Sequence, residues 1–134
     1  MAASKTYAEQ QNIKYAQKIN ELLKIFPEFC REYFNSLEYS KQPRTRLAYA
    51  RDLKTFFEFL IAEFPQYSNY QISDFTLHDI ESVTGQDISD YLRYMKVYDK
   101  DGTTVTNDER AAKRKLCSLR RFYGYYYRYE LISN

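Results

Sequence analysis

The chain has 134 residues, 44% of them hydrophobic, and a formal net charge of +2, as expected for one ordinary globular domain. It contains only three glycines and three prolines, and its apolar residues recur every three or four positions, so we expect an all-α fold. It has no run of about 18 apolar residues and no secretory signal pattern, which argues against a membrane span. Two cysteines are too few for a disulfide framework, so we expect Cys30 and Cys117 to be free thiols in a cytoplasmic protein.

The first half of the chain predicts three helices. Apolar spacing indicates a helix over residues 7–26, and a shorter one begins at Pro27, whose missing N–H costs nothing in a first turn. A polar loop over residues 39–43 follows. The third helix should run from about Arg44 to Phe64, because Pro65 then stops it. Its buried face is expected to consist of Tyr49, Leu53, Phe56, Phe57, Leu60 and Phe64.

The second half contains three capping-box patterns, in which a threonine and an acidic residue three positions later satisfy free N–H groups at a helix start. Thr76 with Asp79 predicts a short turn of helix after a loop over residues 66–75. Thr84 with Asp87 predicts a helix reaching residue 98, and a loop over residues 99–105 should follow. Thr106 with Glu109 predicts a last helix over residues 106–130. Its buried face should comprise Ala112, Leu116, Leu119, Phe122, Tyr123, Tyr126 and Tyr127.

Positive charge is concentrated in two segments. Residues 41–54 carry five basic residues and one acidic residue, and residues 110–128 carry seven basic residues and no acidic one. The rest of the chain has 8 basic and 17 acidic residues. A solvated helix usually mixes charges of both signs, so this segregation indicates a polyanionic partner, as expected for a DNA-facing helix.

The sequence offers no constellation typical of catalysis. It has a single histidine, His78, which has no second histidine or nearby cysteine at metal-ligand spacing, so we expect a capping or surface role for it. Glycine-rich phosphate loops are absent from the sequence as well. We therefore expect no active site, metal or cofactor in these residues. The fifteen tyrosines are interpreted mainly as half-buried core residues, among them Tyr49, Tyr91, Tyr123 and Tyr126.

Three stretches resemble one family, the tyrosine recombinases. TRLAYARDLKTFFEFL, from Thr45 to Leu60, is similar to the family pattern T…Y..DL..F..FL. VTGQDISDYLRYM, from Val83 to Met95, resembles the next family helix, and RKLCSLRRFYGYYY followed by LISN resembles the helix that precedes the catalytic domain. The resemblance covers roughly residues 27–134. The order and spacing of the three motifs make it more specific than any one of them.

The resemblance implies a core-binding domain over residues 27–134, a SAM-like four-helix bundle, with residues 1–26 as an additional helical extension. Such a domain closes over duplex DNA as half of a clamp and works with a separate catalytic domain, in an oligomer assembled on DNA. The family's catalytic residues have no counterpart here, so we expect a fragment that is not an enzyme by itself. Positions matching groove-facing residues of the family are Thr45, Ala48, Arg51, Arg110, Ala111, Arg114 and Ser118.

The charge pattern adds five further basic residues to this expected DNA-binding set. They are Lys41, Arg44, Lys54, Lys113 and Arg121. Two alternatives remain open at the level of sequence. The bundle could be a protein-interaction module whose basic faces bind an acidic partner, or the charged arcs could be only solvated helix faces.

Overall fold

The computed structural model describes residues 6–100, 102–106 and 108–129, and it confirms the expected all-α fold. The larger helices are α1 (Tyr7–Leu23), α2 (Cys30–Leu37), α3 (Pro43–Glu63), α5 (Gly85–Lys96) and α6 (Glu109–Arg128). Between α3 and α5 lie the 3-10 turns η1 (Pro65–Tyr67) and η2 (Ile72–Asp74) and the short helix α4 (Leu77–Glu81). A hairpin of β1 (Val97–Lys100) and β2 (Thr103–Thr106) joins α5 to α6.

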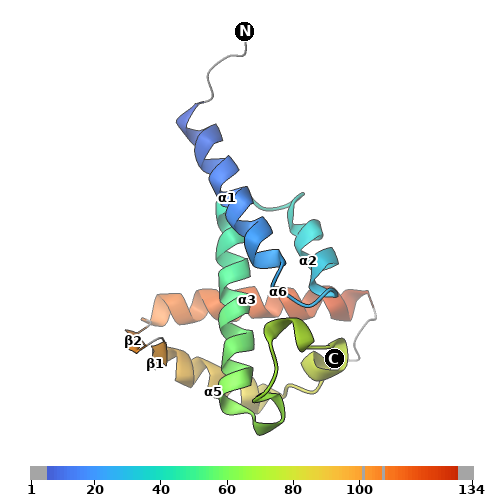
Figure 1. The fold of residues 1–134 in the computed structure, drawn as a ribbon, viewed down its shortest axis with the longest axis vertical. Helices are drawn as coiled ribbons and strands as arrows, with labels where there is room; N and C mark the ends of the chain where they lie inside the picture. The colour runs from blue at the N-terminus through green and yellow to red at the C-terminus, as the bar shows by residue number, and fades with distance from the viewer. Residues whose placement is uncertain (1–5, 101, 107, 130–134) are drawn as a thin grey trace.

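Helix α3 is the centre of the bundle. It packs against α1, α2, α5 and α6, and α6 crosses it near the middle of the molecule (Figure 1). The predicted residues Leu53, Phe56, Phe57 and Leu60 are buried, but so are Leu47, Ala50, Asp52 and Phe59, which the single predicted apolar face did not include. A helix enclosed by neighbours on several sides buries residues around most of its circumference, and periodicity alone does not reveal this.

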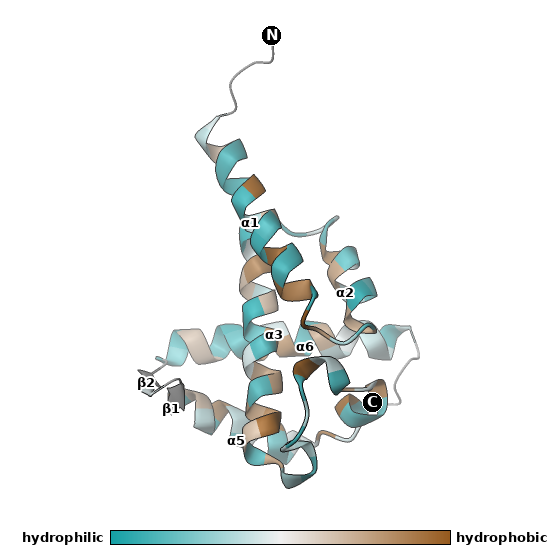
Figure 2. Cartoon of the chain, in the orientation of Figure 1, coloured by the Kyte–Doolittle hydropathy of each residue, from teal (hydrophilic) through white to brown (hydrophobic). Residues whose placement is uncertain are grey.

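Helix α1 packs along α3, and its first half projects beyond the rest of the bundle (Figure 1). A capping box that the sequence analysis did not identify starts it: Thr6 Oγ1 accepts from the Glu9 N–H at 3.1 Å, and Glu9 Oε2 accepts from the Thr6 N–H at 3.2 Å. Only Ile19 is fully buried on this helix. Figure 2 shows mostly hydrophilic residues on the projecting half and hydrophobic residues where the other end meets the bundle.

The capping boxes predicted at Thr76 and Thr84 are both present. Thr84 Oγ1 accepts from the Asp87 N–H at 3.1 Å, and the Asp87 carboxylate accepts from the Thr84 N–H at 2.9 Å. Helix α2 begins at Cys30 instead of Pro27, after a turn in which the Cys30 N–H donates to the Pro27 carbonyl. These boundaries differ from the predicted ones by a few residues because local turns compete with the helix at its ends.

The predicted capping box at Thr106 is wrong. Thr106 pairs with Val97 in the antiparallel hairpin, which replaces the loop expected over residues 99–105, and Asp108 caps α6 instead. The Asp108 carboxylate accepts from the Ala111 N–H at 2.8 Å. Gly102, with a φ of 77°, lies in the hairpin turn, where a left-handed conformation favours glycine.

The core is rich in aromatic rings supplied by α2, α3, α5 and α6. Tyr91 and Tyr126 are fully buried, and Tyr49 and Tyr123 are half-buried against the core, as predicted. Their hydroxyls do not all reach water: Tyr123 donates to the Ile80 carbonyl and Tyr126 to the Phe29 carbonyl, both at 2.8 Å. The prediction that Tyr127 is buried is wrong, since 59% of it is exposed.

Neither cysteine forms a disulfide: Cys30 is buried and Cys117 is exposed on α6, which agrees with the expectation of free thiols. Within the described ranges, no helix is long and apolar enough to cross a membrane.

Candidate nucleic-acid interface

One side of α3 carries a row of exposed or half-buried residues at helical spacing. Arg44, Ala48 and Arg51 follow one another at intervals of four and three residues, and both arginines are exposed. Ala48 is half-buried between them, and Thr45 is half-buried in the first turn. The row therefore combines two cations with a small residue that leaves room for a close approach.

Helix α6 carries a second row, formed by Arg110, Arg114, Arg121 and Arg128, all exposed. The last three lie seven residues apart, which returns each to nearly the same side of the helix. Lys113 is also exposed, although its Nζ pairs with Glu109 Oε1 at 3.4 Å. Both of these side chains are well solvated, so this pair contributes little to stability and leaves the lysine accessible.

A buried carboxylate joins the two rows where the helices cross. Asp52 of α3 accepts from Arg114 Nε at 3.2 Å and from Arg114 Nη2 at 2.7 Å. Its Oδ1 atom also accepts from Lys115 Nζ at 3.0 Å. The side chains of Asp52 and Lys115 are 2% and 8% exposed, whereas that of Arg114 is 52% exposed.

This triad fixes the relative position of α3 and α6. Asp52 directly follows Arg51, and Arg114 lies one turn after Arg110, so the ion pair brings the two rows together where α3 and α6 cross. One carboxylate compensates two cations, which leaves a net positive charge at the crossing. Arg114 has five N–H donors and uses two of them here, so the exposed part of its guanidinium remains able to bind an anion.

Sequence patterns predicted no role for Lys115 or for Asp52 at this interface. A signal was present for each of them. Lys115 falls on the apolar side of its helix, where a cation requires a buried acidic partner, and Asp52 is the single acidic residue among residues 41–54.

The predicted DNA-binding residues differ in accessibility. Arg44, Arg51, Arg110, Lys113, Arg114 and Arg121 are exposed. Lys41, Thr45, Ala48, Lys54 and Ala111 are half-buried. Ser118 is only 4% exposed, in contrast to the groove-facing position expected for it, because it lies on the packed side of α6. The exposed members are therefore all cations, and they come from both crossing helices.

The described residues contain no group of three His, Cys, Asp or Glu side chains that could hold a metal ion. His78 is exposed on the short helix α4. Burial raises the pKa of the Cys30 thiol, which keeps it protonated and makes it a poor nucleophile.

Fold and surface together define an all-α bundle with a cationic face built from two crossing helices. The chain is 34% identical over 110 residues to tyrosine recombinase XerC of Caldanaerobacter subterraneus subsp. tengcongensis, a match covering 78% of this chain and 29% of that protein. The chain is therefore related to the tyrosine recombinases, as its motifs indicated. It spans less than a third of this relative's length. No family model and no solved structure matches the chain.

Proposed function

We propose that the chain is a core-binding, DNA-binding domain of a tyrosine recombinase, whose helices α3 and α6 lie against duplex DNA. The observation that carries this proposal is the Asp52 triad, which joins two rows of exposed arginines at the crossing of α3 and α6. A relationship to the tyrosine recombinases over 78% of the chain supports a DNA substrate.

The binding mechanism is electrostatic and geometric. Exposed arginines on both helices would contact phosphates and release condensed counterions, which supplies most of the affinity. Ala48 and Ala111 are small, so the helices could approach base edges closely. The hydroxyl of Thr45 lies in the first turn of α3, where free N–H groups favour an anion.

The remaining expectations from the family resemblance belong to the same proposal. The domain would form half of a clamp around DNA, work with a separate catalytic domain and act in a homo-oligomer assembled on DNA in the cytoplasm. In this arrangement the domain positions the DNA, and strand cleavage and rejoining take place elsewhere in the assembly.

A salt titration tests the proposal directly. Seven exposed cations belong to the candidate interface, and engagement of about six phosphates gives a slope near −5 for log affinity against log salt. The measurement is the affinity of the chain for a fluorescent duplex of about 20 base pairs at several salt concentrations. Arg51→Gln should make the slope less steep by about 0.9, because one phosphate contact is lost.

The matched control for this titration is Lys18→Gln, which removes an exposed cation from α1 and should leave the slope unchanged. Absence of duplex binding at low salt would overturn the proposal. Binding to an acidic protein under the same conditions would then favour the alternative, a helical protein-interaction module.

A further inference from the structure

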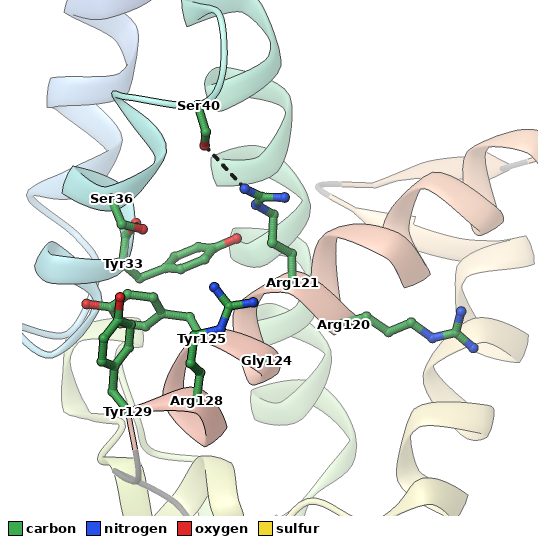
Figure 3. Close-up of a pocket in the computed structure, with 9 residues that line it drawn as sticks. All are labelled: Tyr33, Ser36, Ser40, Arg120, Arg121, Gly124, Tyr125, Arg128 and Tyr129. Carbon is green, nitrogen blue, oxygen red and sulfur yellow. Dashed lines mark hydrogen bonds between the residues drawn. The ribbon is translucent and has the colours of Figure 1, made fainter.

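An open pocket of about 600 Å³ lies between α2 and the C-terminal half of α6. Figure 3 shows its lining residues, which come from both helices and from the chain just after α2. None of the lining residues carries a carboxylate, whereas three of them are arginines. The rings of Tyr33, Tyr125 and Tyr129 form one wall, with neighbouring ring centroids 5.6 Å and 4.9 Å apart.

Two of the three arginines are directed into the pocket. Figure 3 shows the guanidinium groups of Arg121 and Arg128 on the side of Tyr33, whereas Arg120 extends away from them. Arg121 Nη2 donates to Ser40 Oγ at 3.2 Å, which orients this guanidinium above the pocket. Burial raises the pKa of the Tyr125 hydroxyl, and the carboxylate of Glu32, which does not line the pocket, raises this pKa further.

The buried hydroxyl of Tyr33 also indicates that the pocket holds a ligand. Tyr33 is 2% exposed, and its buried hydroxyl has no hydrogen-bond partner among the described residues. Phe34, Phe122 and Tyr125 pack against the ring and fix its direction. In Figure 3 the hydroxyl points toward the space next to Arg121. A buried hydroxyl without a partner costs free energy unless a bound group supplies the missing bond.

The residues that line the pocket provide no anionic acceptor. The guanidinium groups of Arg121 and Arg128 only donate hydrogen bonds, and burial raises the pKa of Tyr33, so its hydroxyl keeps a proton to donate. The group that completes this set has several acceptor oxygens and a negative charge. A phosphate meets both requirements, and arginine pairs bind phosphate with charge-assisted hydrogen bonds.

We propose that this pocket binds a phosphate of the DNA backbone through Tyr33, Arg121 and Arg128. The inference rests on the proposed function and extends the DNA interface along α6. Arg114, Arg121 and Arg128 recur every seven residues, so they lie about 10 Å apart along one side of the helix. The pocket thus continues the row that begins at the crossing with α3.

Two single substitutions test the pocket. Arg128→Gln removes one phosphate contact, so the slope of log affinity against log salt should become less steep by about 0.9. Tyr33→Phe removes only a neutral hydroxyl, so the slope should stay the same while affinity for duplex DNA falls about tenfold at every salt concentration. The measurements use the full chain and the fluorescent duplex described above.

The matched controls are Lys18→Gln and Tyr127→Phe. Lys18 is an exposed cation on α1, and Tyr127 carries an exposed hydroxyl on α6 outside the pocket. Both controls should bind DNA like the wild type. Circular dichroism and thermal melting of every variant identify a loss of folding, and if Tyr33→Phe fails to fold, Arg128→Gln still decides the question.

The possible results distinguish a failure of the proposed function from a failure of the pocket inference alone. A wild-type affinity that does not depend on salt overturns the proposed function and this inference with it. A steep wild-type slope with both pocket variants equal to their controls overturns the pocket inference alone. A nuclear magnetic resonance titration with inorganic phosphate shows whether the phosphate comes from DNA or from solution. If phosphate binds at Ser40 and Arg128 but the pocket variants bind DNA like their controls, the pocket takes a free phosphate, and the DNA assignment is overturned.

Discussion

At the scale of single residues, Asp52 has the largest structural role at the candidate interface. Its buried carboxylate compensates a buried lysine and a half-exposed arginine from another helix. Removing one partner of a buried ion pair leaves an unpaired charge in a poorly solvated site, which costs more than the pair itself contributes. The stability of the bundle and the alignment of its two cationic rows therefore depend on one side chain.

We expect Asp52→Asn to lower the free energy of unfolding by about 3–5 kcal/mol, because the Lys115 ammonium would remain buried without a counter-charge. Urea denaturation followed by circular dichroism measures this loss. Adding Lys115→Met to Asp52→Asn should recover part of it. Glu63→Gln, an exposed change on the same helix, is the control. A denaturation midpoint for Asp52→Asn equal to that of the control would contradict a structural role of the triad.

At the scale of elements, capping determines where α5 begins. Thr84 and Asp87 satisfy each other's backbone N–H groups, and Gly85 and Gln86 between them are exposed. The start of this helix thus depends on local hydrogen bonds, while Tyr91 and Met95 secure its other end in the core.

Thr84→Ala should destabilise the protein by about 1 kcal/mol, because the Asp87 N–H loses its side-chain acceptor. Thermal unfolding is the appropriate measurement. Ser89→Ala provides a comparison, since Ser89 is exposed within the same helix and alanine has the higher helix propensity. If both variants melt at the same temperature, the capping box makes no net contribution.

At the scale of the whole molecule, the aromatic core makes stability sensitive to alkaline pH. Burial raises the pKa of the Tyr33, Tyr123 and Tyr126 hydroxyls in the folded protein, whereas tyrosines in the unfolded chain have a pKa of about 10. The unfolded state therefore loses protons first as the pH rises. The stabilisation is fully present below about pH 10 and is lost progressively above it.

We expect the urea midpoint to begin to fall above about pH 8.5, where the thiol of the buried Cys30 ionises in the unfolded chain, and to fall more steeply beyond about pH 10, where the tyrosines ionise as well. Tyr126→Phe removes one of the three groups and should make this fall less steep, although it also loses the hydrogen bond to the Phe29 carbonyl. Tyr127→Phe should follow the wild type because this residue is exposed. Identical pH profiles for Tyr126→Phe and the wild type would show that Tyr126 does not contribute to the loss of stability at alkaline pH.

The two cationic rows form one surface only in the folded molecule, so charge reversal on either helix should weaken the same interaction. Arg51→Glu and Arg110→Glu together should abolish duplex binding and preserve helix content, because both side chains are exposed and neither belongs to the triad. Gel-shift and circular dichroism measurements test the two halves of this prediction. Arg114→Glu is unsuitable as a binding test, because it would place a second carboxylate beside Asp52. If the Arg51→Glu and Arg110→Glu double variant still binds duplex DNA, the DNA contacts a surface other than these two rows.

Local sequence signals predicted most elements but not all of their ends. Helical periodicity and the boxes at Thr84 and Thr76 were sufficient for α3, α4 and α5, since these signals act within a few residues. The hairpin was missed although Asp101 and Gly102 form a dipeptide typical of hairpin turns. The box at Thr106 failed because hairpin pairing with Val97 took that residue out of the helix.

The sequence alone determined the helical class, the segregation of positive charge and the resemblance to tyrosine recombinases, because these properties depend on composition and short-range order. Tertiary structure alone decided that Asp52 meets Arg114 and Lys115 and that Ser118 is buried. It also decided that Tyr33 directs toward Arg121 a hydroxyl that has no hydrogen-bond partner in the described part of the chain. These facts depend on contacts between residues more than 60 positions apart or on the packing of one helix against another. Such contacts follow from how helices cross, which no local pattern encodes.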